Sequence, residues 1–205
     1  MTSGASPHDL AWPHAGLDRR TALPALVGAH QDFLFVTGLG NPSKEVAALT
    51  GDGNHFFGIG GAMGAACMVG LGLALARPDK RVVVVTGDGE LLMSMGSLAV
   101  VGCAKPPNLA VICVDNGHYG ETGNQVTHTG LGVQLDRIAV ASGISNTMVV
   151  AKEEDLAPGA QLLRSTGGPV FILLRVKQGE APGMGRNLQP AYLRIRFRTA
   201  LLGKA

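Results

Sequence analysis

Two polar side chains follow two apolar runs of the sequence, and both have the chemistry of metal ligands. Asp88, in the tripeptide Gly-Asp-Gly at residues 87–89, comes directly after the apolar run 81–86, and Asn116 closes a second apolar run, 109–114. A magnesium ion bound to a diphosphate needs hard oxygen ligands from the protein at separated points, with phosphate oxygens and water completing the octahedron. The spacing therefore predicts a domain that binds a diphosphate-containing cofactor through magnesium.

The tripeptide alone is a weak indication, because Gly-Asp-Gly is common in hairpin turns. The chain contains a second copy at residues 51–53, which follows no strand-like run and has Asp79-Lys80, without an asparagine, at the equivalent distance after it. The copy at residues 87–89 has a buried strand before it, a helix after it and an asparagine at the end of the next strand. We therefore expect Asp88 to bind metal and the copy at residues 51–53 to be an ordinary loop.

Each residue near the motif has an expected task. Asp88 supplies a carboxylate ligand, Asn116 a neutral amide ligand, and His118 a third ligand through its backbone carbonyl. Gly89 allows the backbone to approach a phosphate, and a helix that begins near Glu90 directs its free N–H groups at the diphosphate. The amide of Asn116 adds no negative charge beside an anionic ligand, which suits this task.

Apolar strands that alternate with helices predict an α/β fold with a doubly wound, mostly parallel sheet and helices on both faces. The expected strands are 33–37, 81–86, 109–114, 147–150 and 169–176. The expected helices are 18–30, 42–49, 60–76, 91–103, 135–142, 152–165 and a short one at 192–202. Residues 50–57 are expected to be a loop. The loop from residue 116 to 131 is long for such a connection, which indicates a functional loop.

This pattern divides the chain into three parts. Residues 1–30 form an N-terminal segment with one helix, residues 31–176 the cofactor-binding domain, and residues 177–205 a C-terminal arm on a neighbouring subunit or on the surface. Residues 1–14 lack the basic start and apolar block of a secretory signal. The most apolar segment, 60–76, is too short for a membrane span and is expected to be a buried helix.

Composition argues against several classes of function. A net charge of +2 and the lack of basic-aromatic clusters argue against nucleic-acid binding. Cys67, Cys103 and Cys113 lie in apolar stretches without a CxxC pair, so a disulfide framework, a zinc site or an iron–sulfur cluster is not expected. They are expected to be core thiols of a cytoplasmic protein. The leucines and methionines of helix 91–103 are also expected to pack in the core.

The two ligands and their spacing resemble the diphosphate-binding motif of thiamine diphosphate enzymes, and the glycine-rich segment at residues 60–64 is similar to the same domain of that family. The family usually has Asn-Asn where this chain has Asp115-Asn116, so the metal-binding second position is kept. The resemblance covers roughly residues 30–176 and implies thiamine diphosphate and Mg²⁺ as cofactors. It implies contacts with them by Gly40, Asn41, Gly61, Ala62, Met63, Gly87, Asp88, Gly89, Glu90, Asn116, His118, Tyr119 and Gly120.

The same resemblance implies that one catalytic group is missing. Members of the family use a glutamate to hydrogen-bond the pyrimidine ring of the cofactor, and that glutamate belongs to a separate pyrimidine-binding domain. Neither the first 30 residues nor the segment after residue 176 is long enough to form such a domain. We therefore expect no catalytic side chain here and a partner subunit that supplies the glutamate within a hetero-oligomer.

Residues 87–98 and 115–125 resemble, more narrowly, the beta subunit of sulfopyruvate decarboxylase and the related part of phosphonopyruvate decarboxylase. That implies non-oxidative decarboxylation of a small anionic 2-oxoacid, with release of an aldehyde. Two alternatives stay open. One is the beta subunit of a 2-oxoacid:ferredoxin oxidoreductase, although the cysteines give no indication of a cluster. The other is a non-catalytic, thiamine diphosphate-binding regulatory subunit.

An anionic substrate needs cationic or hydrogen-bonding groups above the cofactor. Our candidates are His55, His118 and Glu121, with a wider group in the loops expected at the same edge of the sheet. That group comprises Tyr119, Thr122, Asn124, Gln125, Thr127 and His128. His118 ranks first because it lies in the expected metal-binding turn.

Overall fold

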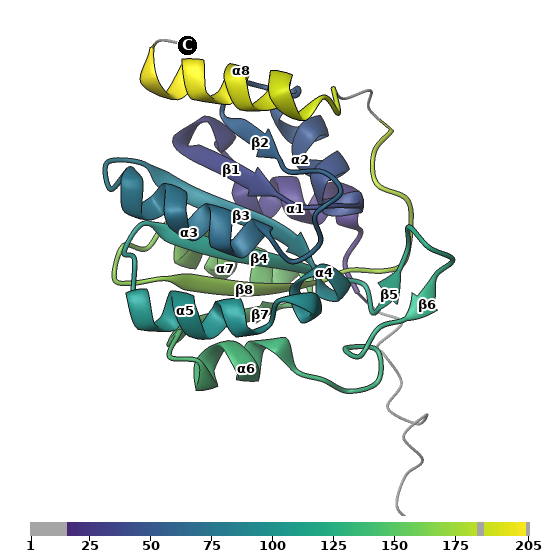
Figure 1. The fold of residues 1–205 in the computed structure, drawn as a ribbon. Coiled ribbons are helices and arrows are strands. Elements are labelled where there is room, and N and C mark those ends of the chain that lie inside the picture. The colour runs from purple at the N-terminus through teal and green to yellow at the C-terminus, as the bar shows by residue number, and fades with distance from the viewer. Residues whose placement is uncertain (1–15, 184–186, 204–205) are drawn as a thin grey trace, which may run out of the picture.

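The centre of the protein is a six-stranded, all-parallel sheet in the order β2-β1-β3-β4-β8-β7 (Figure 1). The structure is a computed structural model that describes residues 16–183 and 187–203. The strands are β1 (Phe33–Thr37), β2 (Phe56–Gly58), β3 (Arg81–Gly87), β4 (Leu109–Asp115), β7 (Asn146–Val150) and β8 (Val170–Arg175). A separate antiparallel hairpin pairs β5 (His118–Tyr119) with β6 (Gln125–Val126).

Helices cover both faces of the sheet, as the alternating pattern predicted. On one face lie α1 (Arg19–Val27), α2 (Asn41–Thr50) and α7 (Leu156–Leu163), and on the other α3 (Ala66–Ala76), α5 (Gly96–Ala104) and α6 (Leu135–Ala141). Two short 3₁₀ helices (His30–Asp32 and Glu153–Asp155) complete the connections. The predicted doubly wound α/β fold is therefore confirmed.

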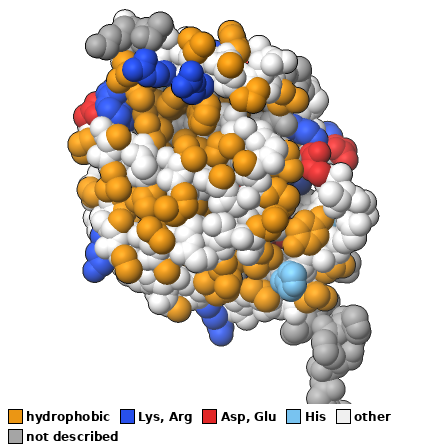
Figure 2. Space-filling view, in the orientation of Figure 1, with side chains coloured by type: hydrophobic (Ala, Val, Ile, Leu, Met, Phe, Trp, Pro, Cys, Tyr) orange, Lys and Arg blue, Asp and Glu red, His pale blue; other side chains and the backbone are white. Residues whose placement is uncertain are grey.

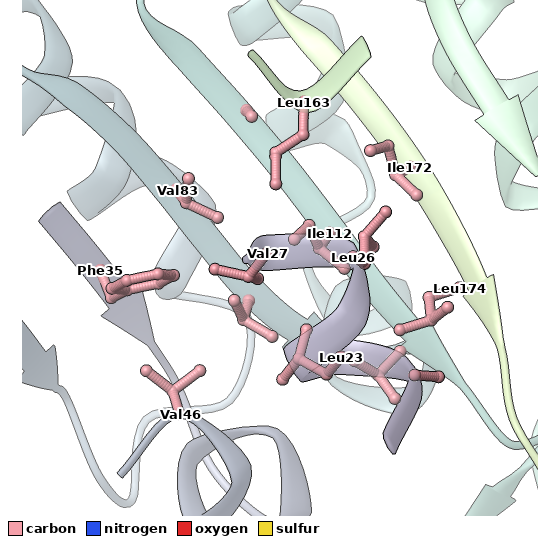
Figure 3. Close-up of a cluster of buried hydrophobic side chains, with 14 of the residues drawn as sticks. Leu23, Leu26, Val27, Phe35, Val46, Val83, Ile112, Leu163, Ile172 and Leu174 are labelled. Carbon is pink, nitrogen blue, oxygen red and sulfur yellow. The ribbon is translucent and has the colours of Figure 1, made fainter. Parts of the chain in front are cut away.

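Each central strand is buried on both faces, because its side chains alternate between two cores. In β3, Val83 and Val85 point to the core under α1, α2 and α7, whereas Val82 and Val84 point to the core under α3, α5 and α6. Figure 3 shows the first core, where leucines of α1 and α7 meet the side chains of β1, β3, β4 and β8. Such strands have no polar face, which explains their continuous apolar runs.

Local structure differs from expectation at three places. Residues 56–58 form strand β2 rather than a loop. Helix α3 begins at Ala66, since Gly60, Gly61 and Gly64 have positive φ angles that end any helical run there. The predicted helix 91–103 is two helices, α4 (Asp88–Met93) and α5, separated at Ser94 and Met95.

The C-terminal segment packs against its own chain. Helix α8 (Pro190–Leu202) lies along the edge strand β2, where the rings of Phe57 and Phe197 are 5.6 Å apart. Arg196 donates hydrogen bonds to the backbone oxygens of Asp52 and Phe56 at 2.7 and 3.1 Å. The predicted helix at 192–202 is present, and it is held on this edge rather than extended away from the domain.

Two further expectations concern cysteines and membranes. Cys67 and Cys113 are buried as expected, but Cys103 is exposed on the outer side of α5, so its assignment as a core thiol is wrong. The run of apolar residues did not show that one side of α5 faces outward. In the described part of the chain, no helix is long and apolar enough to cross a membrane. Residues 1–14, which lack a predicted secretory signal, lie outside the described residues.

Candidate cofactor-binding site

The two residues with the strongest metal-binding pattern lie at one edge of the sheet. Strands β3 and β4 are parallel neighbours, with Gly87 opposite Val114. Asp88 follows the end of β3 as the first residue of α4, and Asn116 follows the end of β4. Both side chains are almost completely buried. The parallel order of the strands therefore brings together two residues that are far apart in the sequence.

Three oxygen-bearing groups cluster at this edge. One terminal atom of the Asn116 amide lies 2.9 Å from the backbone oxygen of His118 and 3.3 Å from Oδ1 of Asp88. When the NH₂ group of Asn116 occupies that position, it donates to the His118 carbonyl and to the Asp88 carboxylate. When the amide is rotated by half a turn, the side-chain oxygen of Asn116 lies beside these two oxygens instead. The three oxygens are then the carboxylate, amide and carbonyl ligands that Mg²⁺ prefers. The predicted trio of Asp88, Asn116 and His118 is thus brought together.

Two threonines hold the Asp88 carboxylate from its other side. Thr127 and Thr129 donate to Oδ2 of Asp88, the latter at 2.9 Å, and Thr129 also lies 2.8 Å from Oδ1 of Asp115. Thr127 was among the wider substrate candidates, whereas Thr129 was not predicted at all. The Thr-His-Thr sequence at 127–129 was the only indication available. These hydroxyls leave Oδ1 of Asp88 directed towards Asn116.

The site is rich in buried negative charge. Burial raises the pKa of Asp88, and the hydroxyls of Thr127 and Thr129 offset only part of that rise. Burial and the neighbouring Asp88 raise the pKa of Asp115 to about 7. Burial also raises the pKa of Glu90. A divalent cation at the oxygen cluster would stabilise the ionised carboxylates, so the electrostatics fit a metal site.

A cleft opens beside the oxygen cluster, at the carboxyl ends of β1, β3 and β4. From β1 the chain continues to β2 on one side of β1, and it then returns to β3 on the other side of β1. The cleft therefore lies at the point where the strand order reverses, which is where ligands bind in doubly wound sheets. Most of the predicted site residues line it. They are Gly40, Asn41, Met63, Gly87, Asp88, Gly89, Glu90, Asn116, His118, Tyr119, Gly120 and Glu121.

The structure gives a packing role to two glycines, Gly89, which lines the cleft, and Gly38, which precedes the lining residue Leu39. A Cβ added to Gly89 would lie 2.3 Å from the ring of Tyr119, so the ring occupies the space that we expected a phosphate to approach. A Cβ added to Gly38 would collide with the carboxylate of Glu90. Glycine at these two positions therefore lets Tyr119 and Glu90 pack against the backbone at the cleft.

Some predicted site residues lie elsewhere. His55 was expected near the ligand edge, but it precedes the first residue of β2 and so lies at the opposite, amino end of the sheet. There its ring stacks on that of His30, with centroids 5.1 Å apart. Its assignment as a substrate candidate is wrong. Gly61 lines a different cleft, beneath α8, and Ala62 and His128 are exposed outside the cofactor cleft.

Residues 54–174 match the family model described as "Thiamine pyrophosphate enzyme, C-terminal TPP binding domain". The chain belongs to this family. The matched region contains Asp88, Asn116 and His118, and it begins just before β2. The relation to thiamine pyrophosphate enzymes inferred from the motif is therefore confirmed.

Named relatives of this thiamine pyrophosphate enzyme domain are decarboxylases. The chain is 35% identical over 168 residues to the sulfopyruvate decarboxylase subunit beta of Methanocaldococcus jannaschii, a match that covers 82% of this chain and 88% of the relative. It is 38% identical over 169 residues to the phosphonopyruvate decarboxylase of Streptomyces viridochromogenes, covering 82% of this chain. The matched region is only 42% of that second protein, so the chain corresponds to less than half of it.

Solved structures support the fold of the thiamine pyrophosphate enzyme domain. The thiamine diphosphate-dependent 4-hydroxybenzoylformate decarboxylase of Rhodococcus jostii RHA1 superposes with a TM-score of 0.59 at 23% identity. The superposition covers 82% of this chain and 34% of that one.

One cationic residue that lines the cleft was not predicted from the sequence. Arg19, at the start of α1, lines the cleft although it is almost completely buried. Its Nε donates to Glu45, and its Nη1 donates to the backbone oxygen of Gly179 at 3.3 Å. Lys44 pairs at 2.8 Å with Glu121, which lines the cleft. Arg19 and Lys44 are thus cationic groups at or beside the cleft, each paired with a carboxylate.

Replacing Thr129 with valine is expected to destabilise the isolated chain by about 1–3 kcal/mol, because the buried carboxylates of Asp88 and Asp115 lose a hydroxyl at nearly unchanged volume. Urea unfolding would measure the change. Thr129→Ser should restore most of the loss. The matched control is Thr122→Val, whose hydroxyl bonds only the exposed Gln125 and whose removal should change stability by less than about 0.5 kcal/mol. Equal effects of both valines would contradict the assigned role of Thr129.

Proposed function

We propose that this chain is the diphosphate-binding subunit of a two-component, thiamine diphosphate-dependent 2-oxoacid decarboxylase of the sulfopyruvate or phosphonopyruvate type. The observation that carries the proposal is the cluster of Asp88, Asn116 and the His118 carbonyl within a thiamine pyrophosphate enzyme domain. The decarboxylase names of the relatives support the reaction type. The reaction would be non-oxidative and would need no electron acceptor.

The residues of the chain have distinct tasks in this proposal. Asp88, Asn116 and the His118 carbonyl hold Mg²⁺, while Thr127 and Thr129 fix the orientation of the Asp88 carboxylate. The backbone around Gly40, Asn41 and Gly87 faces the diphosphate, and Met63, which lines the same cleft, faces the aminopyrimidine. When bound, thiamine diphosphate supplies the nucleophilic carbon and accepts the electrons released with carbon dioxide.

The substrate is a small 2-oxoacid that carries a second anionic group. The cleft offers Arg19 as a buried guanidinium, His118 on the hairpin, and Lys44 paired with Glu121 at the mouth. These groups bind and orient an anion, but none of them is placed to activate the cofactor's pyrimidine ring. We assign that task to a glutamate of a partner subunit, and the name "subunit beta" of several relatives supports the existence of such a partner.

The cellular compartment belongs to the same proposal. Cys67, Cys103 and Cys113 are all free thiols in the structure. Free thiols are typical of a reducing compartment, so we assign the enzyme to the cytoplasm.

Carbon dioxide release tests the reaction. The chain is co-expressed with the pyrimidine-domain subunit encoded in the same genome and assayed with pyruvate, sulfopyruvate and phosphonopyruvate. We expect release that requires both chains, Mg²⁺ and thiamine diphosphate, with no need for an added electron acceptor. Strict dependence on an acceptor would instead support a ferredoxin-linked oxidoreductase. Cofactor binding without turnover on any of the three acids would support a regulatory subunit.

A further inference from the structure

A second cleft lies at the amino ends of the strands, at the end of the sheet opposite the cofactor cleft. Leu34 near the start of β1 and Arg81 at the start of β3 line it, and its volume is about 530 Å³. Its other wall is the C-terminal half of α8, with Phe197 and Leu201. Figure 1 shows this end of α8 on the side of the sheet away from the β5–β6 hairpin. We name this space the amino-end cleft.

The two acidic side chains that line the amino-end cleft already face cations. Asp79 accepts two hydrogen bonds from Arg77, at 2.8 and 2.7 Å, so these two charges largely cancel. Asp32 lies 3.8 Å from the guanidinium of Arg164. Among the described residues, no other carboxylate lines this cleft. Any further cation in it therefore lacks an acidic partner from its own lining.

Two cations of the amino-end cleft are in that position. Lys80 is exposed, and neither it nor Arg81 forms an ion pair with a described residue. Arg81 donates to the backbone oxygens of Pro107 and Leu163, and its Nε is buried without a hydrogen-bond partner in the described part of the chain. Burial and the neighbouring Arg164 lower the pKa of Arg81, so its charge is poorly compensated. Figure 2 shows Lys and Arg side chains beside the C-terminal end of α8, at the upper left, next to hydrophobic side chains.

Neutral groups of the cleft suit the remainder of an anionic ligand. Nε2 of His55 lies 2.9 Å from Nδ1 of His30, and the side chain of Gln31 extends this hydrogen-bonded row. His55 and Gln31 both line the cleft, as do the apolar side chains of Phe197 and Leu201. Small-molecule sites have volumes of about 300–1,000 Å³ and combine apolar walls with a few polar groups. The amino-end cleft meets both conditions.

We propose that the amino-end cleft binds a phosphorylated organic metabolite, with Lys80 and Arg81 on the phosphate and the α8 side chains on its apolar part. A phosphate monoester carries about 1.5 to 2 negative charges at neutral pH, which matches two uncompensated cations, whereas a carboxylate carries only one. The ligand contacts both the sheet and α8, so it holds α8 in place. The site is separate from the cofactor cleft and goes beyond the proposed function.

Calorimetric titration tests the site with phenyl phosphate, the smallest probe that has both a phosphate and an apolar part. Inorganic phosphate lacks the apolar part, and benzoate has the same ring with a single charge. Excess thiamine diphosphate and Mg²⁺ are present throughout, so that the cofactor cleft is not available to the probes. We expect phenyl phosphate to bind about 10-fold or more tightly than either of the other two probes.

Substitutions locate the binding. Lys80→Gln and Arg81→Gln should each weaken binding of phenyl phosphate about 10-fold or more, because each removes one charge from the phosphate site. Lys80 is exposed, so its variant should fold normally even if Arg81→Gln, which loses hydrogen bonds to Pro107 and Leu163, does not. The matched control is Arg137→Gln, an exposed arginine of α6 that does not line the cleft, with an expected change of less than about 2-fold.

Histidine signals in NMR spectra give an independent footprint. Burial and the neighbouring His30 and Arg196 lower the pKa of His55. Phosphate bound in the amino-end cleft should raise that pKa, because a nearby anion stabilises the imidazolium. A pH titration of the imidazole signals with and without phenyl phosphate measures the change. The signals of His118, which lines the cofactor cleft, should not respond to the probe.

The possible outcomes decide between this site and its competitors. Phenyl phosphate that binds no more tightly than inorganic phosphate would overturn the proposal in favour of an adventitious anion only. A response at His118 in place of His55 would assign the binding to the cofactor cleft and would overturn the proposal too. Equal affinities of Lys80→Gln, Arg137→Gln and the wild-type chain would have the same consequence. Each of these results leaves the proposed decarboxylase function intact, because carbon dioxide release tests that function separately.

Discussion

Asp88→Asn is expected to weaken binding of Mg²⁺ and thiamine diphosphate by about 100-fold or more, since the site loses its charged ligand while keeping its shape. The isolated chain should unfold at the same or a higher temperature, because the substitution removes a buried negative charge close to that of Asp115. Thermal unfolding with and without the cofactors measures both effects. The stabilisation that cofactors give the wild-type chain should disappear in the variant.

The second Gly-Asp-Gly copy supplies the control for that experiment. Asp52 lies in a loop with a φ of 50° and pairs with Arg196 of α8, 3.1 Å away. Asp52→Asn should leave cofactor affinity unchanged and should affect only the attachment of α8. Wild-type cofactor affinity in Asp88→Asn, or a comparable loss in Asp52→Asn, would contradict the assignment of Asp88.

Gly102→Ala should destabilise the chain by about 1–3 kcal/mol or more, because α5 lies directly against the end of α6. A Cβ at Gly102 would be 1.8 Å from the backbone oxygen of Ser142, and backbone cannot turn aside as a side chain can. Chemical unfolding of the isolated chain measures the change. Gly96→Ala in the same helix meets nothing within 4 Å and should be neutral or stabilising by up to about 1 kcal/mol. Similar values for both variants would contradict this packing argument.

The proposed metal ligands could be brought together from the sequence because strand ends are local features. Asp88 and Asn116 each follow a continuous apolar run, and parallel strands bring such ends to one edge. Thr129 could not be found in this way. Its hydroxyl reaches Asp88 only because the loop after β4 folds back as the β5–β6 hairpin, and that path depends on contacts between distant residues.

Other errors have equally specific causes. His55 was placed at the wrong end of the sheet because β2 is only three residues long and the sequence pattern did not reveal it. Met93 and Met95 were assigned to the core because they lie in an apolar run, but the structure leaves them 65% and 40% exposed. An apolar run alone does not tell which side of a helix faces outward.

In the proposed metal site, the arrangement around Asp88 would link metal affinity to loop order. Its carboxylate comes from the rigid end of β3, whereas Thr127, Thr129 and the His118 carbonyl all come from the loop after β4. A cation that binds both segments stabilises the folded loop, and by thermodynamic linkage a folded loop raises the affinity for the cation by the same factor. The free energy needed to order residues 117–131 would thus be part of the binding constant of the proposed site, and sequence changes far along that loop would tune cofactor affinity without touching a ligand.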